Sequence, residues 1–165
     1  MQRLLPILLL LAAVLPARAQ DASVPAEGVA WQPFEQAVDS AEADDRYIII
    51  DIYAPWCGWC KKMQRTVYTA DSVQTYLNEH FVPTRLDATA KKSSVEFRGK
   101  TFPVPQLARK LGLRGTPTTV FLKPDGSYLA RRPGFVETDD FLTMLRFIGS
   151  NAHEEQSFKE YAQSK

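Results

Sequence analysis

The strongest constraint on how this chain can fold is the run Tyr47-Ile48-Ile49-Ile50-Asp51-Ile52-Tyr53. Its β-branched and aromatic residues predict a β-strand. Successive side chains of a strand face opposite sides of a sheet, and both sides of this strand are apolar apart from Asp51. Such a strand needs cover on both faces, which is typical of the centre of a sheet packed between layers of helices.

The remaining segments supply the elements for those layers. Apolar residues at helical spacing predict helices, and β-rich runs predict further strands. Lys123-Pro124-Asp125-Gly126 is a turn signal that joins the last two strands into an antiparallel hairpin. Helices are expected over residues 31–45, 58–68, from 71 or 72 onward, 106–111 and 138–148, and strands over 81–86, 118–122 and 127–132. This order predicts an α/β fold with a mixed central β-sheet and helices on both faces.

The two ends of the chain and one long connection lie outside this pattern. Residues 1–19 have the layout of a secretory signal peptide, with a basic start, an apolar stretch over 4–15 and small residues at the cleavage site. We expect residues 20–30 to be a flexible N-terminus and 31–149 to form one domain. Within that domain, the polar residues 87–106 are expected to be an irregular connection. Residues 150–165 are expected to be a polar tail.

Charge and hydropathy exclude two classes of partner. Removing Arg3 and Arg18 with the signal peptide leaves 18 of the 20 basic residues against 19 acidic ones, a net charge of −1. A nearly neutral chain lacks the basic surface that binds nucleic acid, so no nucleic-acid partner is expected. The apolar stretch over 4–15 is shorter than the roughly 20 residues that span a bilayer, so we do not expect a membrane-integral protein.

The sequence contains only two cysteines, Cys57 and Cys60. A disulfide between them closes a very small ring and adds little stability, which favours a chemical role over a structural one. The alternatives to a chemical role are a structural disulfide and a metal-binding pair of cysteines, but the sequence has no second CxxC pair to complete a tetrahedral metal site. If a helix begins at Gly58, Cys57 lies at its N-terminus, where the backbone N–H groups favour a thiolate. We therefore expect Cys57 to be the exposed nucleophile and Cys60 the resolving thiol.

Residues 51–61, Asp-Ile-Tyr-Ala-Pro-Trp-Cys-Gly-Trp-Cys-Lys, resemble the active-site segment of the thioredoxin family. Gly115-Thr116-Pro117-Thr118 resembles the loop that carries the family's cis-proline, and Gly134 matches a glycine near its substrate groove. The resemblance covers about residues 31–149 and implies a thioredoxin fold. Gly-Trp between the cysteines and the long 87–106 connection are departures from a minimal thioredoxin. They resemble exported bacterial thioredoxins of sulfur oxidation or cytochrome maturation.

The resemblance also implies a role for each matching residue. Cys57 would attack a substrate disulfide, Cys60 would resolve the mixed disulfide, and Asp51 would be the buried acid that assists the proton transfer. An isolated acid in an apolar strand should have a raised pKa, which suits that role. Arg85 stands where thioredoxins usually have a lysine partner for the acid. Because an arginine does not give up its proton, the sequence leaves open whether Arg85 pairs with Asp51 or faces solvent.

The expected substrate-binding residues surround the cysteine pair. They are Trp56, Gly58, Trp59, Thr116 and Pro117. Pro117 would face the disulfide while Thr116 offers its backbone to an extended substrate chain. We expect Trp56 to pack over the end of the sheet beside Cys57. Trp59 is expected to be exposed at the rim, where an indole can dock a protein substrate.

These observations predict a periplasmic thiol–disulfide oxidoreductase that acts on protein disulfides through Cys57 and Cys60, as a reductase. A membrane-bound thiol donor would keep it reduced, no cofactor is needed, and a monomer is expected. Two other functions stay open. The first is a disulfide oxidase or isomerase, because the periplasm is kept oxidising. The second is a soft-metal chaperone that holds copper between the two thiolates.

Overall fold

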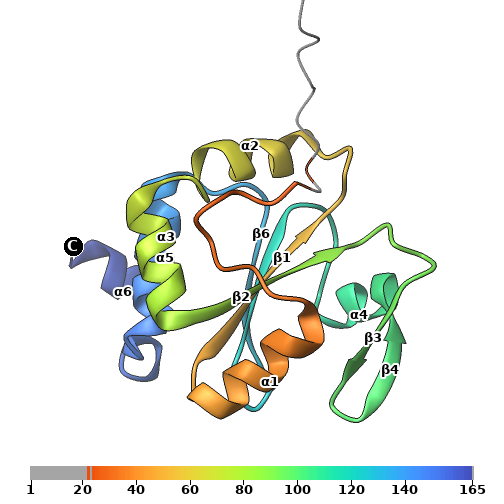
Figure 1. The fold of residues 1–165 in the computed structure, drawn as a ribbon. Helices are drawn as coiled ribbons and strands as arrows, with labels where there is room; N and C mark the ends of the chain where they lie inside the picture. Colours follow the sequence, from red (N-terminus) through yellow and green to blue (C-terminus); the bar gives the residue numbers. More distant parts are fainter. Residues whose placement is uncertain (1–21, 23, 165) are drawn as a thin grey trace, which may run out of the picture.

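The computed structural model of the chain describes residue 22 and residues 24–164 (Figure 1). The expected signal peptide, residues 1–19, lies outside the described residues. Within the described part, no helix is long and apolar enough to cross a membrane.

The predicted strand over 47–53 is β1, and it lies inside a four-stranded sheet of order β2-β1-β5-β6. β1 pairs in parallel with β2 and antiparallel with β5, and β5 pairs antiparallel with β6. The strand bounds are Tyr47–Tyr53 for β1, Phe81–Asp87 for β2, Thr118–Leu122 for β5 and Tyr128–Pro133 for β6. The predicted mixed central sheet is confirmed.

Helices cover both faces of this sheet, as the apolar pattern of β1 requires (Figure 1). Ile48, Ile50 and Ile52 pack with buried residues of α1 and α4 on one face. Ile49, on the opposite face, packs with buried residues of α2, α3 and α5. The helices are α1 Phe34–Asp44, α2 Gly58–Thr66, α3 Asp71–His80, α4 Val104–Lys110 and α5 Thr138–Gly149. Asp51 therefore points into the layer formed by α2, α3 and α5.

The connection over 87–106 is not irregular, as the sequence suggested. It contains a second sheet, the hairpin of β3 Ser94–Phe97 and β4 Lys100–Pro103, followed directly by α4. Arg98 and Gly99 form its turn, with positive φ angles of 52° and 71°. The hairpin lies against the α1 face because Phe97 contacts Phe34 edge to face, with ring centroids 5.6 Å apart. An arginine in a left-handed turn position is a weak sequence signal, which explains why the hairpin was missed.

The C-terminal residues 150–165 were expected to be a polar tail, but they contain two short helices that contact α5. They are the 3₁₀-helix η1 Ala152–Glu154 and the helix α6 Phe158–Gln163. Ser157 and Glu160 make a reciprocal capping box at the start of α6. Tyr161 of α6 is buried, and its ring centroid lies 5.4 Å from that of Phe147 in α5. One buried aromatic ring on a short capped helix thus attaches the tail.

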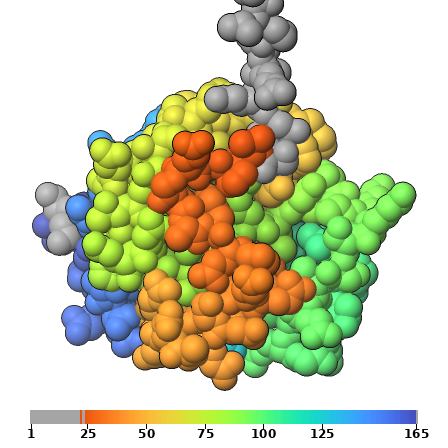
Figure 2. All heavy atoms as spheres, viewed as in Figure 1, coloured from red at the N-terminus to blue at the C-terminus, as the bar shows by residue number. Residues whose placement is uncertain are grey.

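The N-terminal segment, residues 20–30, was expected to be flexible, but its described residues make specific contacts with the domain. Figure 2 shows these residues, in red and orange, running across the surface beside α3. Asn78 of α3 accepts a hydrogen bond from the Ala30 N–H at 2.9 Å and donates one to the Gly28 carbonyl at 2.7 Å. Ala26 and Val29 are buried in the core beneath α3. Small residues and backbone groups hold this segment, and they leave no hydrophobic period in the sequence.

Candidate active site

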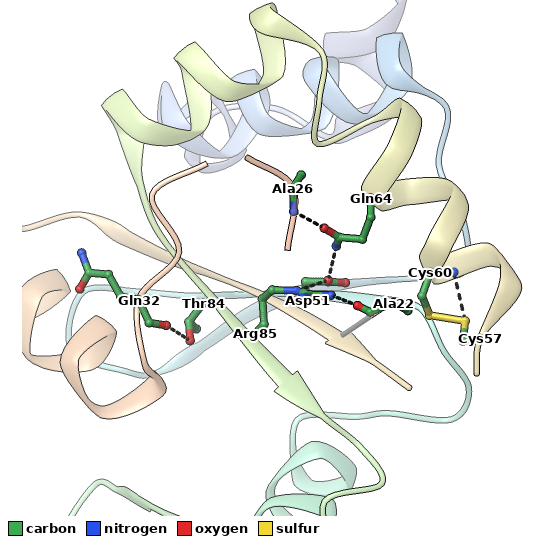
Figure 3. A network of polar contacts seen from close by, with 9 residues as sticks. All are labelled: Ala22, Ala26, Gln32, Asp51, Cys57, Cys60, Gln64, Thr84 and Arg85. Atoms are coloured by element: carbon green, nitrogen blue, oxygen red, sulfur yellow. Dashed lines mark hydrogen bonds and ion pairs between the residues drawn. A yellow bond between two sulfur atoms is a disulfide. The ribbon is translucent and has the colours of Figure 1, made fainter. Parts of the chain in front are cut away.

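Cys57 and Cys60 form a disulfide at the start of α2 (Figure 3). Cys57 is the N-cap residue of the helix, and its Sγ accepts a hydrogen bond from the Cys60 N–H at 3.1 Å. Gly58 opens α2 and is exposed, and a Cβ added to it would meet no other atom within 4 Å. A helix N-terminus and an N–H donor both stabilise negative charge on sulfur. In the reduced protein, Cys57 is therefore the sulfur placed to become a thiolate.

Neither cysteine is openly exposed. Cys57 is only 5% exposed and Cys60 1%, so the expectation of an exposed Cys57 was wrong. The two sulfurs lie in a small buried cluster with Ala22 and Ala54, against which Tyr53 packs. Ala22 belongs to the N-terminal segment, which explains the cover that the α2 sequence alone does not predict. Cys57 remains the more accessible of the two sulfurs.

Asp51 lies in the middle of a row of side chains that crosses the sheet. The strand register places it between Arg85 of β2 and Thr119 of β5. The Arg85 Nε donates to the Asp51 Oδ2 at 3.0 Å, and both side chains are buried. The idea that Arg85 simply faces solvent was therefore wrong. Cross-strand register brings the arginine to the acid, and burial keeps the pair together.

A second donor reaches the same carboxylate oxygen from the helix above. The Gln64 Nε2 donates to the Asp51 Oδ2 at 3.0 Å. Gln64 and Cys60 are four residues apart on α2 and both are buried, so one face of the helix carries the resolving sulfur and a partner of the acid. The sequence analysis missed Gln64, although its spacing from Cys60 was a usable signal.

Burial raises the pKa of Asp51 above its ordinary value, and this effect outweighs the opposing effects of the Arg85 charge and of the hydrogen bonds from Arg85 and Gln64. The predicted direction is confirmed. Its cause differs in one respect from the expectation, because Asp51 is not isolated. A carboxyl group with a raised pKa holds its proton more readily than an ordinary aspartate, which suits it to proton exchange.

The Thr116–Pro117 peptide bond is cis, as the family resemblance implied. Thr118 pairs with Ile52, so Thr116 and Pro117 lie at the same end of the sheet as the segment that leads from β1 into α2. The Gly134 N–H donates to the Pro117 carbonyl at 2.9 Å, with Gly134 at a φ of 83°. The loop and the glycine singled out in the sequence are thus joined directly.

Two tryptophans flank the cysteines on the surface. Trp59 is 59% exposed, as expected of its position beside the cysteines. Trp56 is 74% exposed, so the expectation that it packs over the sheet was wrong. The Trp59 ring lies 5.4 Å from that of Phe135, and the Lys62 Nζ lies 4.1 Å from the Phe135 ring centroid. Phe135 was not predicted, although it directly follows Gly134.

Metal binding was one of the alternatives considered for the cysteine pair. Among residue 22 and residues 24–164, no group of three or more His, Cys, Asp or Glu side chains is arranged to hold a metal ion.

The comparison with protein families decides the relationship. Residues 34–149 match the family model of the thioredoxin-like domain. The chain belongs to the thioredoxin-like family. This membership and the Cys57–Cys60 disulfide together support thiol–disulfide oxidoreductase activity.

Individual proteins similar to this chain include thiol:disulfide interchange proteins and thioredoxin-fold proteins. It is 32% identical over 143 residues to the thiol:disulfide interchange protein DsbD of Ralstonia nicotianae, an alignment that covers 82% of this chain and 22% of that protein. The chain thus spans about a fifth of the length of this relative. A thioredoxin-fold protein from Helicobacter pylori superposes with a TM-score of 0.65 at 19% identity, over 73% of this chain and 84% of the other. The reduced C-terminal domain of Neisseria meningitidis DsbD superposes with a TM-score of 0.50 at 26% sequence identity, over 68% of this chain and 90% of that domain.

The buried carboxyl predicts how the stability of this thioredoxin-like domain depends on pH. For an acid whose pKa is raised by folding, the stabilising contribution is complete below its unfolded pKa and is lost as pH rises through the folded pKa. Asp51→Asn cannot titrate, so it should gain stability relative to wild type as pH rises over that interval. Urea unfolding of both oxidised proteins across the acidic to neutral range measures the difference. A difference that stays constant, or moves the other way, would contradict the raised pKa.

Proposed function

We propose that this chain is a periplasmic disulfide reductase that transfers two electrons from the Cys57–Cys60 dithiol to protein disulfides. The observation that carries the proposal is the arrangement around α2. It combines a disulfide at the helix N-terminus with a buried acid that accepts hydrogen bonds from Arg85 and from Gln64, one helical turn after the second cysteine. A purely structural bridge has no use for a buried ionisable group held in this way.

The first step is attack by the Cys57 thiolate on one sulfur of the substrate disulfide. A bond forms between that sulfur and the Cys57 Sγ, and the other substrate sulfur leaves as a thiolate that takes up a proton. In the second step, the Cys60 thiolate attacks the Cys57 Sγ and displaces the second substrate thiol. The substrate has then gained two electrons and two protons, and the chain has returned to the disulfide form.

Asp51 has its role in the second step. Cys60 must lose its proton before it can attack, yet it is buried away from water. The ionised Asp51 carboxylate can accept that proton, directly or through a water molecule. Because both hydrogen bonds from Arg85 and Gln64 end on Oδ2, we assign Oδ1 as the oxygen that exchanges the proton.

The substrate is an extended segment of a folded or partly folded protein. Its backbone would pair with Thr116, next to Pro117, while apolar residues beside its cysteine contact the exposed indoles of Trp56 and Trp59. Gly58 has no side chain, and the space that a Cβ would occupy there is open, so we expect the substrate sulfur to approach Cys57 past this residue. This docking mode suits proteins better than small disulfides, which lack the flanking residues.

A donor must return the chain to the dithiol form after each cycle. The similarity to DsbD, and the signal-peptide layout of residues 1–19, support a place outside the cytoplasm and a membrane-bound thiol donor. The chain acts as a monomer in this proposal, since one α2 helix carries both sulfurs.

The order of attack is tested by single-cysteine variants. Cys57→Ser should abolish reduction of insulin disulfides, whereas Cys60→Ser should accumulate mixed disulfides through Cys57, because the first sulfur attacks and the second only resolves. Mass spectrometry of the trapped species identifies the bonded cysteine. Trapping through Cys60 in the Cys57→Ser variant would reverse the assignment.

The docking role of Trp59 is tested by Trp59→Ala. We expect kcat/KM for a protein disulfide to fall by about thirtyfold, which corresponds to about 2 kcal/mol for an aromatic anchor at an interface. The value for a small aromatic disulfide should hardly change. Tyr128→Ala is the matched control, because Tyr128 is also an exposed aromatic residue but lies at the far end of the sheet. An equal loss with both substrates would show that Trp59 supports the fold of the site instead.

A further inference from the structure

The N-terminal segment is bonded to both residues that hold Asp51. The Ala26 N–H donates to the Gln64 Oε1 at 2.8 Å, and the Arg85 Nη2 donates to the Ala22 carbonyl at 2.6 Å (Figure 3). The Gln64 Nε2 and the Arg85 Nε each donate to the Asp51 Oδ2. Two backbone groups of one segment therefore reach the acid through two different side chains.

The same segment also touches the disulfide. Ala22 is completely buried, in the cluster that contains Ala54, Cys57 and Cys60. Its N–H donates to the Pro55 carbonyl at 3.3 Å, just ahead of the cysteines. Ala22 thus lies between the disulfide on one side and the Arg85 guanidinium on the other.

The guanidinium of Arg85 has little freedom to move while Ala22 is in place. Its Cζ lies 4.0 Å from the ring centroid of Tyr53 and 5.6 Å from that of Trp31. The flat group is therefore enclosed by two aromatic rings, a carboxylate and a backbone carbonyl. Ala22 is the only one of these that comes from outside the domain predicted over 31–149.

We propose that Ala22 and Ala26 form a strap that positions Arg85 and Gln64 on Asp51 and keeps water away from the Cys60 sulfur. Arg85 and Gln64 are then positioning residues, and the strap sets the rate at which Cys60 resolves a mixed disulfide. The inference rests on the proposed function, because it concerns the second step of that reaction.

The groups that face Asp51 allow the effect of the strap to be separated from that of the arginine. Arg85 faces it from β2, Cys60 and Gln64 lie on α2, Thr119 lies on β5, and Tyr68 follows α2 and interacts with the Asp51 charge. Arg85 is the only cation among them. Removal of the Arg85 charge disfavours the ionised carboxylate and raises the pKa of Asp51, whereas entry of water favours the carboxylate and lowers that pKa.

The test replaces the buried Ala22 with a residue too large for its position. Ala22→Gln places a long polar side chain where no exposed surface exists, so it should displace the strap from Arg85 and the disulfide. Val24→Gln is the matched control, because Val24 lies two residues along and is 62% exposed. Ala26→Pro is a second variant that removes only the N–H donated to Gln64.

The measurement is the rate of resolution of a preformed mixed disulfide between Cys57 and a thionitrobenzoate group, followed by stopped flow across pH. We expect Ala22→Gln to slow the resolution by about tenfold at neutral pH, because the acid is present but no longer fixed. The acid limb of its pH profile should move to lower pH, since relief of burial is the largest effect on the pKa of Asp51. Ala26→Pro should slow the same step, and Val24→Gln should match wild type.

Arg85→Met should shift the acid limb of the pH profile in the direction opposite to the shift in Ala22→Gln. Loss of the cation should move the acid limb to higher pH. Arg85→Lys should restore the position of that limb without restoring the full rate, because a lysine has a single nitrogen in place of the planar fork that bonds Asp51 and Ala22 from two separate atoms. A merely structural role would lower the amount of folded protein and leave the limb where it is.

Two outcomes contradict different claims. If wild type reduces protein disulfides but Ala22→Gln and Ala26→Pro both resolve mixed disulfides like Val24→Gln, the strap has no role and the proposal is wrong. If wild type itself neither forms nor resolves mixed disulfides, the proposed function fails, whatever the variants do.

Discussion

The burial of one carboxylate in the central strand is the constraint on which the rest of the site depends. β1 is covered on both faces, so Asp51 cannot be solvated, and an ionised acid in such a place requires partners. Arg85 comes from the neighbouring strand by register, and Gln64 comes from the helix that carries the cysteines. The acid therefore ties the sheet to α2 at the point where Cys60 lies.

The same contacts explain why the N-terminal segment is ordered. Arg85 and Gln64 each have hydrogen-bonding capacity left after they bond Asp51, and buried polar groups require partners. Backbone atoms of Ala22 and Ala26 supply them. The hydrogen bonds that satisfy one buried acid thus run from Asp51 to two side chains, and from these side chains to the N-terminal segment. Ala22 also covers Cys57, because it bonds Arg85 and packs in the cluster that contains the disulfide.

The parts of the fold that the sequence predicted are those with strong local signals. The Ile-rich strand, the Lys123–Gly126 turn and the spacing of Cys57 and Cys60 each depend on residues close together in the chain. The missed features depend on contacts between distant residues. The pairing of Arg85 with Asp51 needs the strand register, and the attachment of residues 22–30 depends on backbone groups and small side chains that have no periodic pattern. The Arg98-Gly99 turn and the burial of Tyr161 are in the same class, because weak local preferences are decided by packing.

The central claim is that Cys57 and Cys60 form a reversible, reducing redox centre. It is tested most directly by equilibrating the full mature chain with glutathione buffers of known ratio and measuring the fraction of the dithiol by thiol alkylation and mass spectrometry. We predict a two-electron transition with a reduction potential near that of thioredoxin, about −270 mV. A potential near −120 mV, as in a strong oxidant, would contradict the reductase direction, and a pair that does not exchange with glutathione would contradict the redox centre itself.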